Sequence, residues 1–232
     1  EAINHGGIAN NAKVNIKWVD AEKFEKDNKN KHLHNVCGVL VPGGFGERGI
    51  EGKIKTSKYA RENNIPFLGI CLGMQMSIVE VGRNVLNLKD CHSSEFSKTK
   101  NPVIGLMTEW RKGKQLEKRT IKSDKGGTMR LGSYKCIIKK NSLAYKIYSK
   151  TEINERHRHR YEVNNKFVKQ LKDNGLIVSG VNKELDLVEI IELEDHPWFV
   201  GVQFHPELKS RVLRAHPLFR DFVSAATKYH KK

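Results

Sequence analysis

Gly69-Ile70-Cys71-Leu72-Gly73 is the stretch that decides the fold of this chain. It follows the apolar run at residues 65–68 and leads into the apolar and polar mixture at residues 74–80. This order predicts a buried strand, a sharp turn with a cysteine at its apex, and then a helix. The pattern is the cysteine form of the G-x-S-x-G nucleophile elbow, in which glycines let strand and helix approach closely around a strained turn.

A cysteine at the beginning of a helix suits nucleophilic chemistry. The positive end of the helix dipole lowers the pKa of a thiol, and the free backbone N–H groups there can bind a developing oxyanion. The sequence therefore predicts an enzyme that forms a covalent acyl intermediate on Cys71.

A nucleophilic cysteine needs a base, and His205 is the best candidate by context. It follows the apolar run at residues 199–204 and precedes Glu207 by two positions. Residues two apart in an extended chain face the same side, so Glu207 is expected to bond one imidazole nitrogen and leave the other for the thiol. A lone His before Pro is more often a structural residue at a strand end; the combination with Cys71 favours a Cys-His-Glu triad.

Composition narrows the class of protein. A length of 232 residues with 38% hydrophobic content fits one large α/β domain, and no Pro/Ser-rich linker or repeat divides residues 1–232. No apolar run approaches the ~20 residues of a membrane span. Four widely spaced cysteines without a C-x-x-C pair argue against a zinc site or a disulfide framework, and favour a reducing, cytoplasmic setting.

The formal net charge of +16 raises the question of a nucleic-acid partner. Basic clusters stand at residues 110–114 and 117–119. The cations are otherwise scattered, and few aromatic residues stand among them to stack on bases. A solvated, lysine-rich surface is the favoured interpretation.

Strand and helix patterns alternate along the chain, which predicts an α/β fold with a central, mainly parallel sheet flanked by helices on both faces. Residues 91–128 are expected to be polar and irregular. Strands are expected at residues 14–19, 36–42, 65–70, 129–138, 160–164, 176–179, 187–193 and 199–204, and helices at residues 50–63, after Cys71, at 166–173 and at 218–228.

A second glycine-rich turn, Pro42-Gly43-Gly44-Phe45-Gly46, follows its own predicted strand. It lacks the Gly-Lys-Ser/Thr ending of a P-loop and does not fit a dinucleotide fingerprint. Two interpretations stay open and are compatible: a tight strand–helix connection, and a loop whose N–H groups face an oxyanion beside the nucleophile.

Together, these motifs resemble the triad-type (class I) glutamine amidotransferases. The resemblance rests on Pro-Gly-Gly-Phe-Gly, on Gly-Ile-Cys-Leu-Gly-Met-Gln at residues 69–75 and on Gln-Phe-His-Pro-Glu at residues 203–207. Further blocks resemble the CTP synthase branch of that family, and the similarity covers nearly the whole chain. They lie at residues 41–52, 86–90, 93–96, 126–132, 155–164 and 196–199.

The resemblance implies a flavodoxin-like glutaminase domain spanning residues 1–232. Cys71 would attack the side-chain amide of L-glutamine, giving ammonia and a γ-glutamyl thioester that water hydrolyses. His205 would move the protons, with Glu207 orienting it. The family's glutamine-binding positions match Gly44 and Leu72, whose N–H groups would bind the oxyanion, together with Gly73, Met74, Gln75, Glu95 and Arg160.

The resemblance also implies partners. CTP synthases carry an N-terminal amidoligase (synthetase) domain that uses ATP and Mg²⁺ to aminate UTP, with GTP as allosteric activator, and they form homotetramers. This sequence begins Glu1-Ala2-Ile3 without an initiator Met, and we expect it to begin at a boundary inside a longer protein, without that domain. No cofactor or metal is expected in this domain.

Two other functions stay open on the residues alone. One is a different Cys-His-Glu hydrolase of the same fold, such as a γ-glutamyl hydrolase, which would need no ammonia acceptor. The other is a basic RNA- or DNA-binding module with vestigial catalytic residues. The intact set of Cys71, His205 and Glu207 argues against the second, since a degenerate site usually loses a member.

Overall fold

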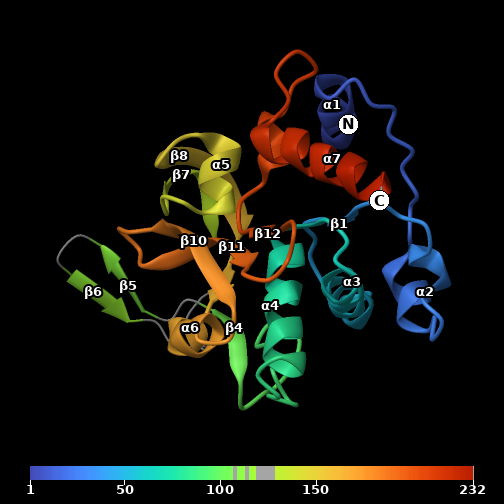
Figure 1. The fold of residues 1–232 in the computed structure, drawn as a ribbon. Coiled ribbons are helices and arrows are strands. Elements are labelled where there is room, and N and C mark those ends of the chain that lie inside the picture. The colour runs from blue at the N-terminus through green and yellow to red at the C-terminus, as the bar shows by residue number, and fades with distance from the viewer. Residues whose placement is uncertain (107–108, 113–114, 119–128, 232) are drawn as a thin grey trace.

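A seven-stranded sheet forms the centre of the computed structural model, which describes residues 1–106, 109–112, 115–118 and 129–231. The strand order is β1-β2-β12-β11-β10-β7-β8 (Figure 1). The bounds are β1 (Val39–Val41), β2 (Phe67–Ile70), β12 (Phe199–Val202), β11 (Leu187–Leu193), β10 (Leu176–Asn182), β7 (Arg130–Ile138) and β8 (Glu152–His159).

The sheet is mixed in its pairing. β1 and β12 each pair in parallel with β2, whereas the other four neighbouring pairs are antiparallel. In direction, β1, β2, β12, β10 and β8 run one way, and β11 and β7 run the other. The expectation of a mainly parallel sheet thus holds for strand direction and for the three strands around Cys71. It does not hold for the remaining pairings. For β10–β11 and β11–β12, the short connections at residues 183–186 and 194–198 leave no room for a crossover.

Helices cover both faces of this sheet (Figure 1). On one face, α1 (Ala2–Ala9), α5 (Leu143–Tyr148) and α7 (Pro217–His230) share one apolar core with Leu68 and Ile70 of β2. On the other face lie α3 (Ile50–Glu62), α4 (Leu72–Asn84) and α6 (Asn165–Lys172). Because both faces are covered, β2 is buried along its whole length, as its continuous apolar sequence predicts.

Smaller elements complete the fold. A three-stranded sheet of β3 (His92–Ser93), β4 (Pro102–Leu106) and β9 (Tyr161–Val163) packs beside α4, and β5 (Glu109–Lys112) pairs with β6 (Gln115–Lys118). The prediction that residues 91–128 are irregular is therefore wrong for the strands among the described residues. The basic side chains noted at residues 110–114 and 117–119 lie outside what the structure describes. The remaining elements are α2 (Ala21–Glu25) and the 3-10 helices η1 (Lys31–Leu33) and η2 (Pro206–Lys209).

The strand predicted at residues 14–19 is wrong. This segment is not part of any strand or helix, and Trp18 in it is 88% exposed. Alternating residues make a strand only where the backbone finds a neighbour to pair with, and the sheet pairings described here do not include this segment.

The other expected elements are confirmed with small shifts of their ends, including α3, α6, β10, β11, β12 and α7. α1, α5 and β8 were not predicted. β8 was missed because polar residues occupy most of its buried face, so the sequence does not alternate between apolar and polar residues. The buried residues are Ile153, Glu155, His157 and His159.

All four cysteines are free thiols. Within the described ranges, no helix combines the length and apolar character needed to cross a membrane.

Candidate active site

Cys71 lies at the apex of a sharp turn between β2 and α4. Its φ of 51° and ψ of −104° fall in a region that residues with a side chain rarely adopt. The Cys71 N–H donates to the carbonyl oxygen of Val202 at 2.7 Å, and its own carbonyl accepts from the Gln75 N–H at 3.1 Å. The neighbouring strand and the first turn of α4 therefore hold the predicted nucleophile elbow in its strained shape.

The two glycines of the elbow are required by close backbone packing. A Cβ on Gly73 would lie 2.1 Å from the carbonyl oxygen of Val41 in β1, and one on Gly69 would lie 2.9 Å from the backbone of Gly73. Both distances are far below van der Waals contact. The glycine spacing thus sets how deeply the beginning of α4 sits against the strands.

His205 and Glu207 form the predicted pair. Nδ1 of His205 lies 2.6 Å from Oε1 of Glu207. The backbone N–H of His205 donates to the backbone carbonyl oxygen of Arg156 in β8. The backbone geometry that brings the two side chains together differs from the one expected. Glu207 lies in the 3-10 helix η2 and not in an extended segment. A short helical turn brings the carboxylate back to the imidazole.

The second imidazole nitrogen is available. Nε2 of His205 is buried, and no described residue gives it a hydrogen-bond partner. The ring and the thiol border the same glycine: a Cβ on Gly43 would lie 2.7 Å from Cε1 of His205 and 3.5 Å from Cβ of Cys71. Nε2 is thus the imidazole nitrogen that Glu207 leaves for another partner, on a ring that borders the same glycine as Cys71.

The electrostatics of the thiol correct one expectation. Burial raises the pKa of Cys71 to about 12; the Leu72 N–H lowers it, and the carboxylates of Glu162, Glu207 and Glu95 raise it further. The predicted lowering of this pKa by the start of α4 is therefore outweighed by burial. Burial therefore favours the neutral thiol, and a nucleophilic role for Cys71 requires a base to take its proton.

Alkylation of the free protein should report this raised pKa. Iodoacetamide reacts with the thiolate, so the rate constant at Cys71 should keep rising with pH past the ordinary range of a cysteine near 8.5. Peptide mass spectrometry over a pH series, with Cys71→Ser as the blank, measures it. A plateau below pH 9 would contradict the assignment of a neutral thiol.

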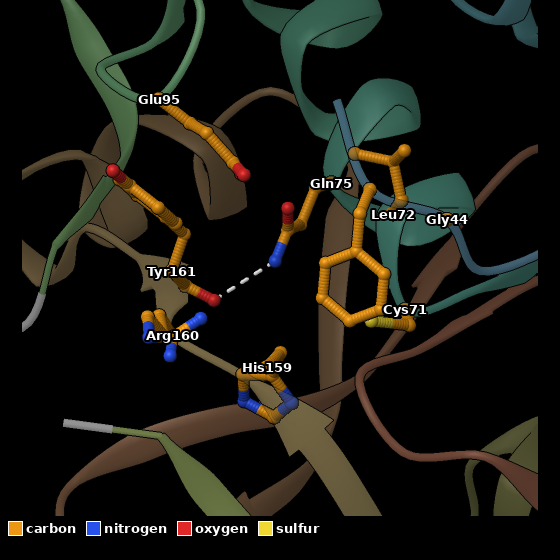
Figure 2. Close-up of a pocket in the computed structure, with 9 residues that line it drawn as sticks. Gly44, Cys71, Leu72, Gln75, Glu95, His159, Arg160 and Tyr161 are labelled. Carbon is orange, nitrogen blue, oxygen red and sulfur yellow. Dashed lines mark hydrogen bonds between the residues drawn. The ribbon is translucent and has the colours of Figure 1, made fainter. Parts of the chain in front are cut away.

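A pocket of about 400 Å³ opens above the thiol, within the size range of small-molecule sites. In Figure 2, Cys71, Leu72 and Gly44 stand on one side, and Glu95 and Arg160 stand on the other. Five positions predicted from the sequence, these four and Gln75 of α4, therefore meet Cys71 around one cavity. Gly73 and Met74 lie in the first turn of α4 beneath it.

One polar side chain of the pocket is fixed by a hydrogen bond, whereas another has a buried nitrogen without a partner among the described residues. Nε2 of Gln75 donates to the Tyr161 carbonyl oxygen at 2.8 Å (Figure 2). Nε of Arg160 is buried, and the described residues offer it no hydrogen-bond partner. Sequence reasoning missed Phe45, His159 and Tyr161, which complete the lining. Phe45 lies in the motif Pro-Gly-Gly-Phe-Gly and the other two lie in the block at residues 155–164, so membership in these motifs was the available signal.

A buried ionic cluster lies behind the pocket. Arg130 donates to Glu162 at 3.0 Å and to Glu189 at 2.6 Å, and Nε2 of His159 lies 2.7 Å from the same Glu162 oxygen. Burial raises the pKa of Glu162, but His159 and Arg130 outweigh it and hold the value below normal. Burial raises the pKa of Glu189 to about 8 despite Arg130. The cluster braces His159; among the described residues, no group of His, Cys, Asp and Glu is arranged to hold a metal ion.

Comparison with known proteins decides the family. The family model described as "Glutamine amidotransferase class-I" matches residues 1–225. The chain belongs to the class-I glutamine amidotransferases. Within this family, it is 55% identical over 227 residues to a CTP synthase of Rhizobium johnstonii and 54% identical over 226 residues to one of Agrobacterium fabrum. These alignments cover 98% and 97% of the chain but 42% of each relative, so the chain spans less than half their length.

Solved structures agree with this family. The Trypanosoma brucei CTPS glutaminase domain with bound acivicin superposes on this amidotransferase with a TM-score of 0.86 and 35% identity, over 98% of this chain and 86% of that one. A putative GMP synthase protein of Thermoplasma acidophilum matches with a TM-score of 0.57 at 18% identity, over 95% of this chain and 83% of that one, and shows likeness of fold alone.

Proposed function

We propose that this class-I amidotransferase hydrolyses L-glutamine to glutamate and ammonia through a γ-glutamyl thioester on Cys71. The observation that carries the proposal is one pocket with a strained thiol on one side and a carboxylate and a guanidinium, Glu95 and Arg160, on the other. Free glutamine has the complementary groups: a side-chain amide for the thiol, an α-ammonium for Glu95 and an α-carboxylate for Arg160.

Acylation begins with the transfer of the thiol proton from Cys71 to Nε2 of His205. The thiolate attacks the amide carbon, a C–S bond forms, and the carbonyl electrons move to oxygen. The N–H groups of Leu72 and Gly44 bind this oxyanion. The intermediate then collapses, the C–N bond breaks, and the imidazolium returns the proton to the leaving ammonia. Glu207 holds Nδ1 and stabilises the imidazolium while it exists.

Deacylation repeats these steps with water. His205 takes a proton from the water, whose oxygen attacks the thioester carbon, and the C–S bond breaks. The proton returns to Sγ of Cys71. The sum is glutamine and water giving glutamate and ammonia, with the enzyme unchanged.

The bound amino acid is oriented by its α groups. Glu95 approaches from the turn after β3, and Arg160 from the junction of β8 and β9. Gln75 and the backbone of Gly73 and Met74 contact the substrate from the beginning of α4. Holding both ends of the substrate turns attack on its amide into an intramolecular step.

We further propose that the ammonia serves an ATP-dependent amination of UTP to CTP. Similarity to CTP synthases at 55% identity supports this, as does likeness to a CTPS glutaminase domain that binds acivicin, a glutamine analogue. The amination would belong to a synthetase domain that binds ATP and Mg²⁺ and responds to GTP, in a cytoplasmic homotetramer.

Steady-state release of ammonia tests the glutaminase proposal. L-Glutamine should be turned over with saturation, and γ-glutamyl peptides poorly, since a γ-glutamyl hydrolase would prefer the peptides. Glu95→Gln and Arg160→Met should each raise KM about 10- to 100-fold, because each removes a hydrogen bond to a charged group, and should change kcat little.

Arg220→Met serves as the control, because Arg220 is an exposed arginine of α7 that does not line the pocket; it should keep the KM of the unchanged protein. Preference for γ-glutamyl peptides would overturn the proposal, and so would an unchanged KM in both pocket variants.

A further inference from the structure

Gln203 is a buried residue that contacts both the nucleophile Cys71 and the pocket residue Gln75. It follows β12, precedes His205 by two residues, and its side chain is fully buried. Its Nε2 lies 3.7 Å from Sγ of Cys71, within reach of a hydrogen bond to sulfur. Its Oε1 accepts from Nε2 of Gln75 at 3.1 Å.

The orientation of the Gln203 amide follows from its neighbours. The carbonyl oxygen of Tyr161 can only accept, so the group of Gln75 that faces it at 2.8 Å is the amide NH₂. The same NH₂ faces Gln203, which therefore presents its oxygen to Gln75. The NH₂ of Gln203 is then left to point at the sulfur. The backbone carbonyl of Tyr161 thus sets the direction of a chain of hydrogen bonds, here called the relay, that runs through Gln75 and Gln203 to Cys71.

The sulfur needs such a donor. A thiol is a weak hydrogen-bond acceptor, but the thiolate formed in acylation is charged and accepts strongly. Around it stand the carboxylates of Glu162 in β9, Glu207 in η2 and Glu95 after β3, which oppose a negative charge on sulfur. His205 gains a positive charge as it takes the proton, and Leu72 offers its N–H.

We propose that Gln203 is a catalytic residue whose amide N–H stabilises the thiolate of Cys71. The inference rests on the proposed function, in which the Sγ proton moves to Nε2 of His205 before the C–S bond forms. Gln203 acts in that interval, and its hydrogen bond weakens again when the negative charge passes to the substrate oxygen. Since Gln75 also lines the pocket, substrate that fixes Gln75 fixes the donor at the sulfur.

Two variants of Gln203 distinguish the effect of its hydrogen bond to Cys71 from that of its hydrogen bond to Gln75. Gln203→Met keeps the length of the side chain and loses both hydrogen bonds. Gln203→Glu keeps an acceptor for Gln75 and loses the donor to sulfur. Iodoacetamide alkylation of Cys71 at a fixed, mildly alkaline pH should slow about tenfold or more in both, with the Glu variant slower. kcat for glutamine should fall similarly, and KM should change less than about threefold.

Ser77→Ala is the matched control. Ser77 is also fully buried and lies on α4, but its hydroxyl donates to Met74 O and is not part of the relay. It should alkylate at the rate of the unchanged protein. Melting temperatures show whether each variant is folded. If Gln203→Met does not fold, the alkylation rate of Gln203→Glu alone tests the role of Gln203.

Alkylation of Gln203→Glu at the unchanged rate would overturn the proposal, as would equal slowing in Ser77→Ala. The alkylation rate measures the reactivity of the Cys71 sulfur in the absence of substrate. If the unchanged protein released no ammonia from glutamine, the proposed function would fail, while the alkylation series would still decide the role of Gln203.

Discussion

Replacing Cys71 with alanine is expected to abolish glutamine hydrolysis. The thiol is the only group proposed to bond to the substrate, and loss of a nucleophile from a catalytic triad typically costs at least about 10,000-fold in kcat. Ammonia release from L-glutamine measures the loss. Cys37→Ala is the matched control, because that half-buried thiol contacts His230 and lies outside the pocket; it should retain full activity.

The same position should show the cost of the strained turn. Cys71 holds φ at 51° and ψ at −104°, which glycine adopts without a side-chain clash. Cys71→Gly should therefore be more stable than Cys71→Ala by about 1–3 kcal/mol. Thermal or urea unfolding measures the difference, and equal stability of the two variants would contradict the idea that the elbow stores strain. Retained turnover in either would refute the assignment of the nucleophile.

Replacing Gly73 with alanine should disable the site through the backbone. The added Cβ would meet the Val41 carbonyl oxygen at 2.1 Å, and a backbone atom cannot move aside by a change of rotamer. Alanine favours a helix over glycine by about 1 kcal/mol, but overpacking of this kind costs about 1–3 kcal/mol, so net destabilisation is expected. α4 must also shift away from β1, and the N–H of Leu72 shifts with it. We expect kcat to fall at least about 100-fold.

Gly105→Ala provides the comparison for this variant. A Cβ at Gly105 in β4 meets nothing nearer than Ser94 Oγ at 3.8 Å, and the substitution should leave kcat within about twofold. Unfolding curves and ammonia release on both proteins test the argument. Normal activity in Gly73→Ala would mean that the depth of α4 against the strands does not matter to the chemistry.

The elbow and the contact of His205 with Glu207 could be predicted from the sequence because their signals are local. The apolar run before Cys71 and the flanking glycines specify the turn within a few residues, and His205 with Glu207 follows the same logic. The contact of that pair was predicted correctly for an incomplete reason, since η2 and not an extended chain brings them together.

The buried face of β8, which contributes His159 to the pocket, could not be predicted from local pattern. β8 buries Glu155, His157 and His159, charged or polar residues whose alternation reads as a solvated segment until partners such as Arg130 and Glu162 are known. These partners come from β7 and β9 and meet β8 only in the folded chain. Family resemblance placed Arg160 in the site; its sequence neighbours did not.

The pKa of the Cys71 thiol also could not be predicted from the local sequence. The beginning of α4 after Cys71 predicted a lowered value, and that local effect exists as the Leu72 N–H. Burial depends on the whole fold and outweighs it. The helix beginning is visible in the sequence, but the depth at which the sulfur sits is not.

Covalent labelling by a glutamine analogue tests the central claim most directly. 6-Diazo-5-oxo-norleucine carries the α groups of glutamine and an electrophilic carbon in place of its amide. Peptide mass spectrometry should find one adduct, on Cys71, and excess L-glutamine should slow its formation. An adduct on Cys37, Cys91 or Cys136 with Cys71 unmodified, or labelling that glutamine does not slow, would contradict the account.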